Sequence, residues 1–301
     1  MLRRLRRPSG RGARLRLLRR DAQRADYTKV RTPPAPRPVR VAVVLSAGGL
    51  RGAAHAGVLR QLVRHGIRID AIVGVSAGAV VAAYYAAVGL DVEDLVWDAA
   101  VFRGRHLLLH SLNVRLAYRL ERRLGPRCGV IPERLRQLED ARFDRLHHGV
   151  QRLGIVCHDV RSRSTRYFAT GTDHGVPLSA AVRASASIPH LFPPIAVNGD
   201  GGPLELIDGG VSDALPLTFA RGPAIGATHV IVSDCRWIGR VPVTDPTTVW
   251  IRPRMWTTGT LWAPARGLAL AVRDGEAAVT PEALRRIHAW FEDGVPIAAA
   301  G

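Results

Sequence analysis

The feature that most constrains this sequence is residues 70–89 (DAIVGVSAGAVVAAYYAAVG), which carry a serine between glycines at their centre. The apolar residues 71–73 are typical of a strand that is buried on both faces. A run of small and apolar residues without proline follows Ser76 and predicts a helix that packs on all sides. The stretch therefore predicts a strand, a sharp turn and a helix.

A serine at such a turn points its hydroxyl away from the sheet, with the start of the helix beneath it. Gly74 and Gly78 keep Cβ atoms away from the turn on both sides of Ser76. Hydrolases present a nucleophile in this way, so Ser76 is a candidate catalytic residue. The G-x-S-x-G pattern is short and also arises by chance in chains rich in glycine and alanine, so the rest of the chain must decide.

A second strand-turn-helix pattern precedes the first one. Residues 41–46 (VAVVLS) predict a buried strand, residues 47–52 (AGGLRG) a glycine-rich turn, and residues 54–63 an amphipathic helix. Backbone amides in such a turn bind negative charge. A dinucleotide pyrophosphate is one candidate, but position 47 is alanine and Asp70 precedes its strand instead of ending it. The other candidate is the oxyanion of an acyl intermediate, and Ser76 follows the next strand at the same sheet edge.

A candidate base for Ser76 lies where residues 204–207 predict a strand that ends in Asp208-Gly209-Gly210. This turn can approach another backbone closely because neither glycine carries a side chain. An alternative role for Asp208 is to close an Asx turn. A free aspartate, with a pKa of about 3.9, is a weak base at neutral pH, so we expect Asp208 to lie in an apolar pocket that raises its pKa.

The positive charge is concentrated at the N-terminus. The chain has 301 residues and a net charge of +18, and residues 1–40 hold 14 arginines and lysines against two aspartates. Repulsion between these charges, together with four prolines at positions 33–38, predicts a disordered tail and linker over residues 1–40. This tail can contact an anionic membrane. Nucleic-acid binding is not expected, because no aromatic residue accompanies the arginines before Tyr27.

The rest of the chain, residues 41–301, is expected to form one domain, with residues 91–150 as a helical insertion that caps the site. Three distant cysteines, Cys128, Cys157 and Cys235, indicate neither a disulfide framework nor a zinc site. No apolar run is long enough for a transmembrane helix or a signal peptide. We therefore expect a cytoplasmic protein, with peripheral membrane contact through the tail as an option.

Four short motifs follow one another along the chain, at residues 47–59, residues 74–78, residues 183–194 and residues 208–210. In this order they resemble the patatin-like phospholipase family of the bacterial type. The resemblance covers roughly residues 41–235 and implies a three-layer α/β/α fold with a mostly parallel central sheet. It also implies hydrolysis of phospholipids or related acyl esters by a Ser-Asp dyad that needs no histidine, metal or cofactor.

Matched position by position, the resemblance makes Ser76 the nucleophile, on a strand-to-helix turn, and Asp208 the base. The amides of Gly48 and Gly49 would form an oxyanion hole, with Arg51 nearby. The site residues implied by the motifs are Gly48, Gly49, Leu50, Arg51 and Gly52 around the oxyanion hole, and Gly74, Gly78, Gly209 and Gly210 beside the dyad. Alanine at position 47 departs from the usual glycine, and it would be strained if that position needs a positive φ.

Two other functions remain open from the sequence. An α/β-hydrolase esterase would also use Ser76 and Asp208, with His229 or His288 as the third member of a triad. A catalytically inactive membrane-binding module is the second alternative, since it would explain both Ala47 and the basic tail. The glycine-rich turn, which ends about 24 residues before the serine, and the Asp-Gly-Gly sequence favour the dyad.

Overall fold

The computed structural model describes residues 38–101, 131–172, 174–239, 245–264 and 266–292. The chain divides into two units, Met1–Arg37 and Pro38–Gly301, and the second unit contains every element described below. Most of the basic segment expected over residues 1–40 lies outside the described residues. The same holds for residues 102–130 of the expected cap.

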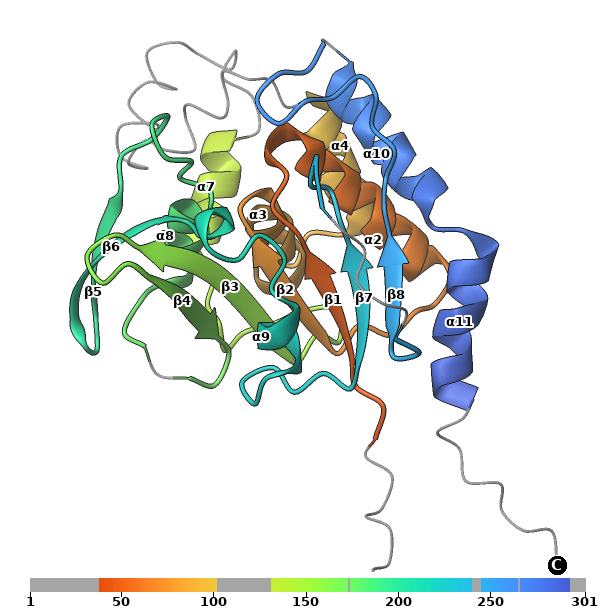
Figure 1. The fold of residues 1–301 in the computed structure, drawn as a ribbon, viewed down its shortest axis with the longest axis horizontal. Helices are drawn as coiled ribbons and strands as arrows, with labels where there is room; N and C mark the ends of the chain where they lie inside the picture. The colour runs from red at the N-terminus through yellow and green to blue at the C-terminus, as the bar shows by residue number, and fades with distance from the viewer. Residues whose placement is uncertain (1–37, 102–130, 173, 240–244, 265, 293–301) are drawn as a thin grey trace, which may run out of the picture. The chain divides into compact units, whose positions relative to one another are not determined.

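An eight-stranded sheet forms the centre of the second unit, in the order β5-β6-β3-β2-β1-β7-β8, with β4 paired to β3 (Figure 1). Five neighbouring strands, β3, β2, β1, β7 and β8, are parallel, whereas β4, β5 and β6 run antiparallel to their neighbours. This confirms the α/β fold with a mostly parallel sheet. The strands are β1 Val41–Leu45, β2 Ala71–Val75, β3 Arg152–Asp159, β4 Ser164–Ala169, β5 Ile195–Gly199, β6 Gly202–Asp208, β7 His229–Ser233 and β8 Thr248–Ile251.

Helices cover both faces of the sheet, which explains why β1 and β2 are apolar at every position and buried throughout. The larger core lies between one face and the layer that contains α2, α3, α4, α8 and α10, and the smaller core lies under α9. The helical segments are η1 Gly49–Ala53, α2 Ala54–Arg64, α3 Ala77–Ala83, η2 Tyr84–Val88, α4 Val92–Val101, α7 Ile131–Asp140, α8 Leu178–Ser185, η4 Gly209–Val211, α9 Leu217–Arg221, α10 Gly267–Ala278 and α11 Pro281–Glu292.

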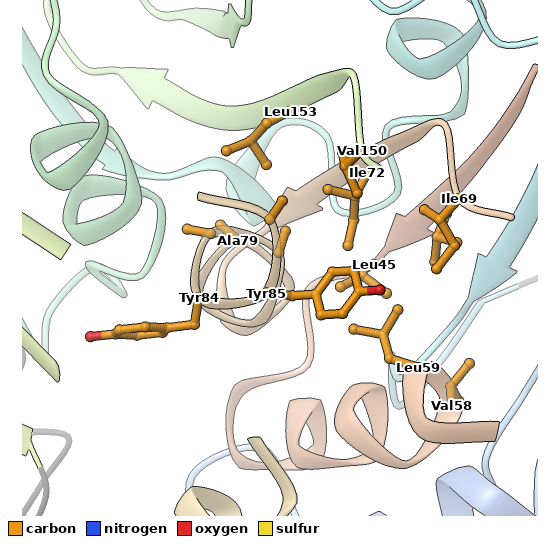
Figure 2. Close-up of a cluster of buried hydrophobic side chains, with 14 of the residues drawn as sticks. Leu45, Val58, Leu59, Ile69, Ile72, Ala79, Tyr84, Tyr85, Val150 and Leu153 are labelled. Carbon is orange, nitrogen blue, oxygen red and sulfur yellow. The ribbon is translucent and has the colours of Figure 1, made fainter. Parts of the chain in front are cut away.

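The larger core joins the first two strand-turn-helix units. Figure 2 shows Leu45, Ile72 and Leu153, from three adjacent strands, on the same side of the sheet as Leu59 of α2. Tyr85 of η2 reaches this cluster, and its ring also stacks on His148. The helix that follows the serine turn, α3, therefore packs in one continuous apolar core with β1, β2, β3 and α2.

Strands β2 and β6 meet end to end on one edge of β3. In β3, Gly154 pairs with β2 on one side and with β4 on the other, and His158 pairs with β4 and with β6. Because β4 holds one edge along this length, β2 and β6 share the opposite edge. The last residue of β2 lies opposite Val156, and Asp208 of β6 lies opposite Cys157. The ends of the two strands are thus one β3 residue apart.

The sequence analysis assigned no structure to β8 and α10. Strand β8 has only four residues, and α10 contains Gly267 and Gly275, which lower helix propensity. Gly275 has a packing role instead. A Cβ at Gly275 would collide with the backbone of Ala54 in α2, and a Cβ at Gly57 in α2 would collide with Val272 of α10. Close contact between the two helices therefore outweighs the propensity.

Candidate active site

Ser76 is the N-cap of α3 and has φ 57° and ψ −127°, a conformation that residues other than glycine rarely adopt. Hydrogen bonds of its backbone hold it there. Its amide donates to Ser185 Oγ at 2.9 Å, and its carbonyl accepts from the amide of Ala79 at 2.9 Å. The side chain is buried at the sharp strand-to-helix turn that the sequence predicts.

The glycines beside Ser76 are required by contact with backbone atoms. A Cβ at Gly74 would collide with the carbonyl of Gly78, and a Cβ at Gly78 would collide with the carbonyl of Leu45 at the end of β1. The turn therefore lies directly on the neighbouring strand, and no side chain fits between them.

Asp208 accepts a hydrogen bond from the hydroxyl of Ser76, with 2.7 Å between Oγ and Oδ2. Its other oxygen, Oδ1, accepts from the amide of Gly210 at 2.7 Å. A Cβ at Gly209 would collide with the carbonyl of Val156, so this turn also lies against β3. The end-to-end meeting of β2 and β6 thus brings together two residues that are 132 positions apart.

Burial raises the pKa of Asp208 to about 6, and the hydrogen bonds from Ser76 and Gly210 partly oppose this shift. At neutral pH the carboxylate is ionised and nevertheless far more basic than an aspartate in water. This matches the apolar surroundings expected for a base that takes a proton from serine.

Ser185 of α8 is a part of the site that the sequence analysis did not single out. Its hydroxyl accepts from the Ser76 amide and donates to the carbonyl of Val156 in β3 at 2.6 Å. Ser185 therefore links the strained serine turn to the strand that sets the position of Asp208. The signal lay within residues 183–189, which carried the family resemblance without an assigned role.

The glycine-rich turn touches both the serine turn and the aspartate turn. A Cβ at Gly52 would meet Ala77, the residue after Ser76, and a Cβ at Gly210 would come within 3.1 Å of the Ala47 Cβ. The amide of Leu50 donates to Thr260, and the amide of Arg51 donates to Gly48. Among the described residues, the amides of Gly48 and Gly49 have no backbone or side-chain acceptor, so these two donors can serve an oxyanion.

Arg51 lies in the glycine-rich turn beside Gly48 and Gly49, and its side chain contacts backbone carbonyls. Its guanidinium is buried and donates to three backbone carbonyls, those of Cys235, Met255 and Thr258, at 3.0 to 3.1 Å. A guanidinium has a fixed set of N–H donors, and these carbonyls occupy several of them. Arg51 therefore joins the glycine-rich turn to the C-terminal loops.

Ala47 is not strained. The residues with positive φ other than glycine are Ser76, His148, Arg163 and His190 in the described part of the chain. The Ala47 amide donates to the carbonyl of Ala214 at 3.0 Å. The positive φ in this turn belongs to Gly49, so alanine at position 47 keeps the shape of the turn.

A buried histidine holds the start of the same turn. His55 of α2 lies within hydrogen-bond distance of the Ser46 carbonyl through Nε2, at 3.0 Å, and of Ser233 Oγ through Nδ1, at 2.8 Å. A carbonyl can only accept, so Nε2 carries the proton and Nδ1 accepts from the serine. Burial lowers the pKa of His55 to about 4, which keeps the ring neutral at physiological pH.

The histidines considered for a triad do not reach the pair. His229 is the first residue of β7. In the register of the sheet, β1 lies between β7 and β2, and the first residues of β7 and β2 lie beside the start of β1. Ser76 follows the opposite end of β2. His288 lies on α11, which packs on β8. In the part of the chain that the structure describes, no histidine is hydrogen-bonded to Ser76 or Asp208.

The fold and the site define a class: α/β proteins that present a serine on a strand-to-helix turn against an aspartate from a neighbouring strand. A family model described as patatin-like phospholipase matches residues 43–221, which include the glycine-rich turn, Ser76, Ser185 and Asp208. The chain belongs to the patatin-like phospholipase family.

Two relatives give the extent of the similarity. The NTE family protein Rv1063c of Mycobacterium tuberculosis, described as uncharacterized, is 30% identical over 230 residues that cover 74% of this chain. The uncharacterized protein YqhO of Bacillus subtilis is 27% identical over 219 residues, which cover 62% of this chain and 69% of YqhO. The chain spans 58% of the length of the mycobacterial relative.

Among solved structures, VipD from Legionella pneumophila aligns with a TM-score of 0.47 and 13% identity, over 84% of this chain and 67% of VipD.

In the residues that the structure describes, no helix combines the length and the apolar character needed to cross a bilayer.

Proposed function

We propose that this protein is a serine acyl hydrolase that cleaves carboxylic ester bonds of phospholipids or related lipids through the Ser76-Asp208 dyad. The observation that carries the proposal is the direct 2.7 Å hydrogen bond between the serine hydroxyl and the buried carboxylate. A nucleophile and its base within hydrogen-bond distance are what covalent catalysis requires. Membership of the patatin-like phospholipase family supports a lipid ester as the substrate class.

In the proposed reaction, Ser76 Oγ attacks the ester carbonyl while Asp208 takes its proton. The amides of Gly48 and Gly49 stabilise the negative charge that develops on the carbonyl oxygen. The intermediate collapses when the leaving alcohol receives the proton from Asp208, which leaves the acyl group on Ser76. Asp208 then takes a proton from water, and the hydroxide formed attacks the acyl carbon. This second intermediate collapses when Asp208 gives the proton to Ser76 Oγ, which releases the fatty acid and restores the free enzyme.

The acyl chain is proposed to lie along the loop of residues 188–192. The Asp208 amide donates to the carbonyl of Ser187 at 3.0 Å, so this loop starts beside the carboxylate. Its Leu191 is exposed, and Ile188 and Phe192 are half-buried. Such a partly open apolar surface next to the nucleophile suits an aliphatic chain.

Hydrolysis of p-nitrophenyl butyrate and of phosphatidylcholine vesicles by the purified full chain tests the proposal. A fluorophosphonate should label Ser76, as identified by mass spectrometry of the modified peptide, because it reacts with activated serines. No hydrolysis of either ester together with no labelling would overturn the proposal and favour the inactive membrane-binding alternative.

The activity should rise with pH through the range in which Asp208 ionises. The protonated carboxyl cannot accept the serine proton, and the pKa of this group is about 6. We therefore expect kcat/KM for p-nitrophenyl butyrate to fall about tenfold per pH unit below that value and to level off above it. A profile measured between about pH 4.5 and pH 8 that stays flat would contradict the assignment of Asp208 as the base.

Replacing both His229 and His288 by alanine should leave hydrolysis of the soluble ester within about twofold of the original rate. Neither side chain lies near the dyad, and His229 instead packs on Trp290. The measurement is kcat/KM at a temperature at which the double variant is folded, as shown by circular dichroism. A loss of a thousandfold or more would indicate a Ser-Asp-His triad, because removal of a triad histidine has effects of at least this order.

A further inference from the structure

The most exposed large apolar side chains of the described chain are gathered in two loops. Trp256 is 88% exposed, Ile238 84%, Trp262 68% and Trp237 64%, and Leu261 in the same region is also exposed. Single exposed apolar residues are common, but a group of three tryptophans with Ile238 and Leu261 marks an interaction surface. These five residues are called the tryptophan surface below.

The tryptophan surface lies at the edge of the sheet that holds the candidate active site. Trp237 and Ile238 follow β7, and the other three residues follow β8, so both loops leave the carboxyl ends of parallel strands, as the serine turn does. Figure 1 shows the blue loop from β8 to α10 beyond the arrowhead of β8. Within this loop, the carbonyl of Thr260 accepts from the Leu50 amide at 2.8 Å. The surface therefore adjoins the turn that holds the proposed oxyanion donors.

Hydrogen bonds from the buried side chain of Arg51 connect the two loops. Its guanidinium donates to Cys235 before the first loop and to Met255 and Thr258 in the second. The same group lies 4.8 Å from the centre of the Trp237 ring, which is a cation-π distance. The exposed side chains thus belong to loops that hydrogen bonds already hold in place. Burial of their apolar area on a partner would therefore cost little conformational entropy of the loops.

Exposed arginines flank the second loop of the tryptophan surface. Arg254 and Arg266 are exposed in or beside the second loop. No aspartate or glutamate occurs between Asp245 and Asp274 in the sequence. The carboxylate of Asp234, which precedes the first loop, is buried and paired with Arg236 and Arg252. An apolar surface flanked by arginines complements the anionic headgroups and the acyl boundary of a bilayer, where tryptophan is favoured.

We propose that the tryptophan surface binds the face of a phospholipid bilayer that contains anionic lipids and brings the Ser76 site to the membrane. Only one part of this inference rests on the proposed function, namely that the protein meets its lipid substrate in a bilayer. Binding itself requires no hydrolysis, so the two proposals can be tested separately.

The test compares the full chain with a Trp256→Ser, Trp262→Ser variant in cosedimentation with vesicles of phosphatidylcholine and phosphatidylglycerol. We expect the partition coefficient of the variant to fall by at least about tenfold, since two large apolar contacts are lost. Trp97→Ser is the matched control, because Trp97 is 55% exposed on α4, outside the tryptophan surface. The control should bind vesicles as the original chain does.

Hydrolysis separates this inference from the proposed function. The double variant should keep its rate on soluble p-nitrophenyl butyrate and lose about tenfold or more on vesicles. Unchanged vesicle binding by the double variant would overturn the inference even if the enzyme is active. If light scattering shows a dimer that the double variant does not form, and vesicle binding is weak in both proteins, the surface joins two copies of the chain and the inference is wrong. An original chain that binds vesicles but hydrolyses no ester would contradict the proposed function alone.

Discussion

Replacing Ser76 by alanine is expected to lower kcat/KM for p-nitrophenyl butyrate by at least about a thousandfold, because the substitution removes the hydroxyl that is proposed to form the acyl-enzyme. Asp208→Asn should have an effect of the same order. An asparagine oxygen can still accept from the Gly210 amide, but the amide group cannot take up the proton of the serine hydroxyl. The double variant should be no worse than either single variant, since the two residues act as one unit.

Two nearby residues provide matched controls for the dyad variants. Ser212→Ala changes an exposed serine four positions after Asp208, and Asp213→Asn changes a carboxylate that accepts from Tyr167. Both should retain nearly full activity. Because unfolding would also abolish activity, all five variants require thermal unfolding curves. Full activity of folded Ser76→Ala would remove the basis of the proposed mechanism.

The second large effect concerns stability. Gly78→Ala should lower the free energy of unfolding by about 3 kcal/mol or more, because the new Cβ would collide with the Leu45 carbonyl in the close-packed centre of the fold. Helix propensity alone predicts the opposite sign, since alanine is favoured over glycine in a helix by up to about 1 kcal/mol. The expected fall in Tm is about 6 °C or more for a domain of this size.

Gly201→Ala is the matched control for this prediction. Gly201 lies in the turn between β5 and β6, and a Cβ there would meet no atom within 4 Å. Its free energy of unfolding should change by no more than about 0.5 kcal/mol. A Gly78→Ala variant as stable as the control would show that α3 can move away from β1, and the turn would then be less rigid than its contacts indicate.

The parallel strands, the two turns and the candidate residues Ser76 and Asp208 were predictable because each depends on a local pattern. A continuous apolar run predicted β1 and β2, and a serine or an aspartate beside glycines marked each turn. The resemblance to a family supplied the pairing of Ser76 with Asp208. That pairing depends on the register of two strands along β3, and no local pattern encodes register between segments so far apart.

The supporting residues of the site could not be predicted in the same way. Arg51 is buried, and nothing in the sequence pattern around it indicates this burial. The hydrogen-bond partners of its guanidinium are backbone carbonyls, which every residue possesses. His55 falls on the buried face of an amphipathic helix, where its ring contacts a carbonyl and a serine from β1 and β7. Such contacts arise only when distant segments pack together, so composition and spacing carry no trace of them.

The end-to-end arrangement of β2 and β6 on β3 has a consequence for how this chain can change in length. The distance between Ser76 and Asp208 is measured along a single strand, by the pairing of Val75 with Val156 and of Asp208 with Cys157. Among the intervening connections, α8 and the residues after it also take part, because Ser185 holds the Ser76 amide and Ser187 accepts from the Asp208 amide. Segments that contact neither turn can lengthen, shorten or be exchanged for unrelated ones, and Ser76 and Asp208 still meet as long as β3 keeps its register. The chain thus separates the part that fixes these two residues from the parts that are free to diversify around them.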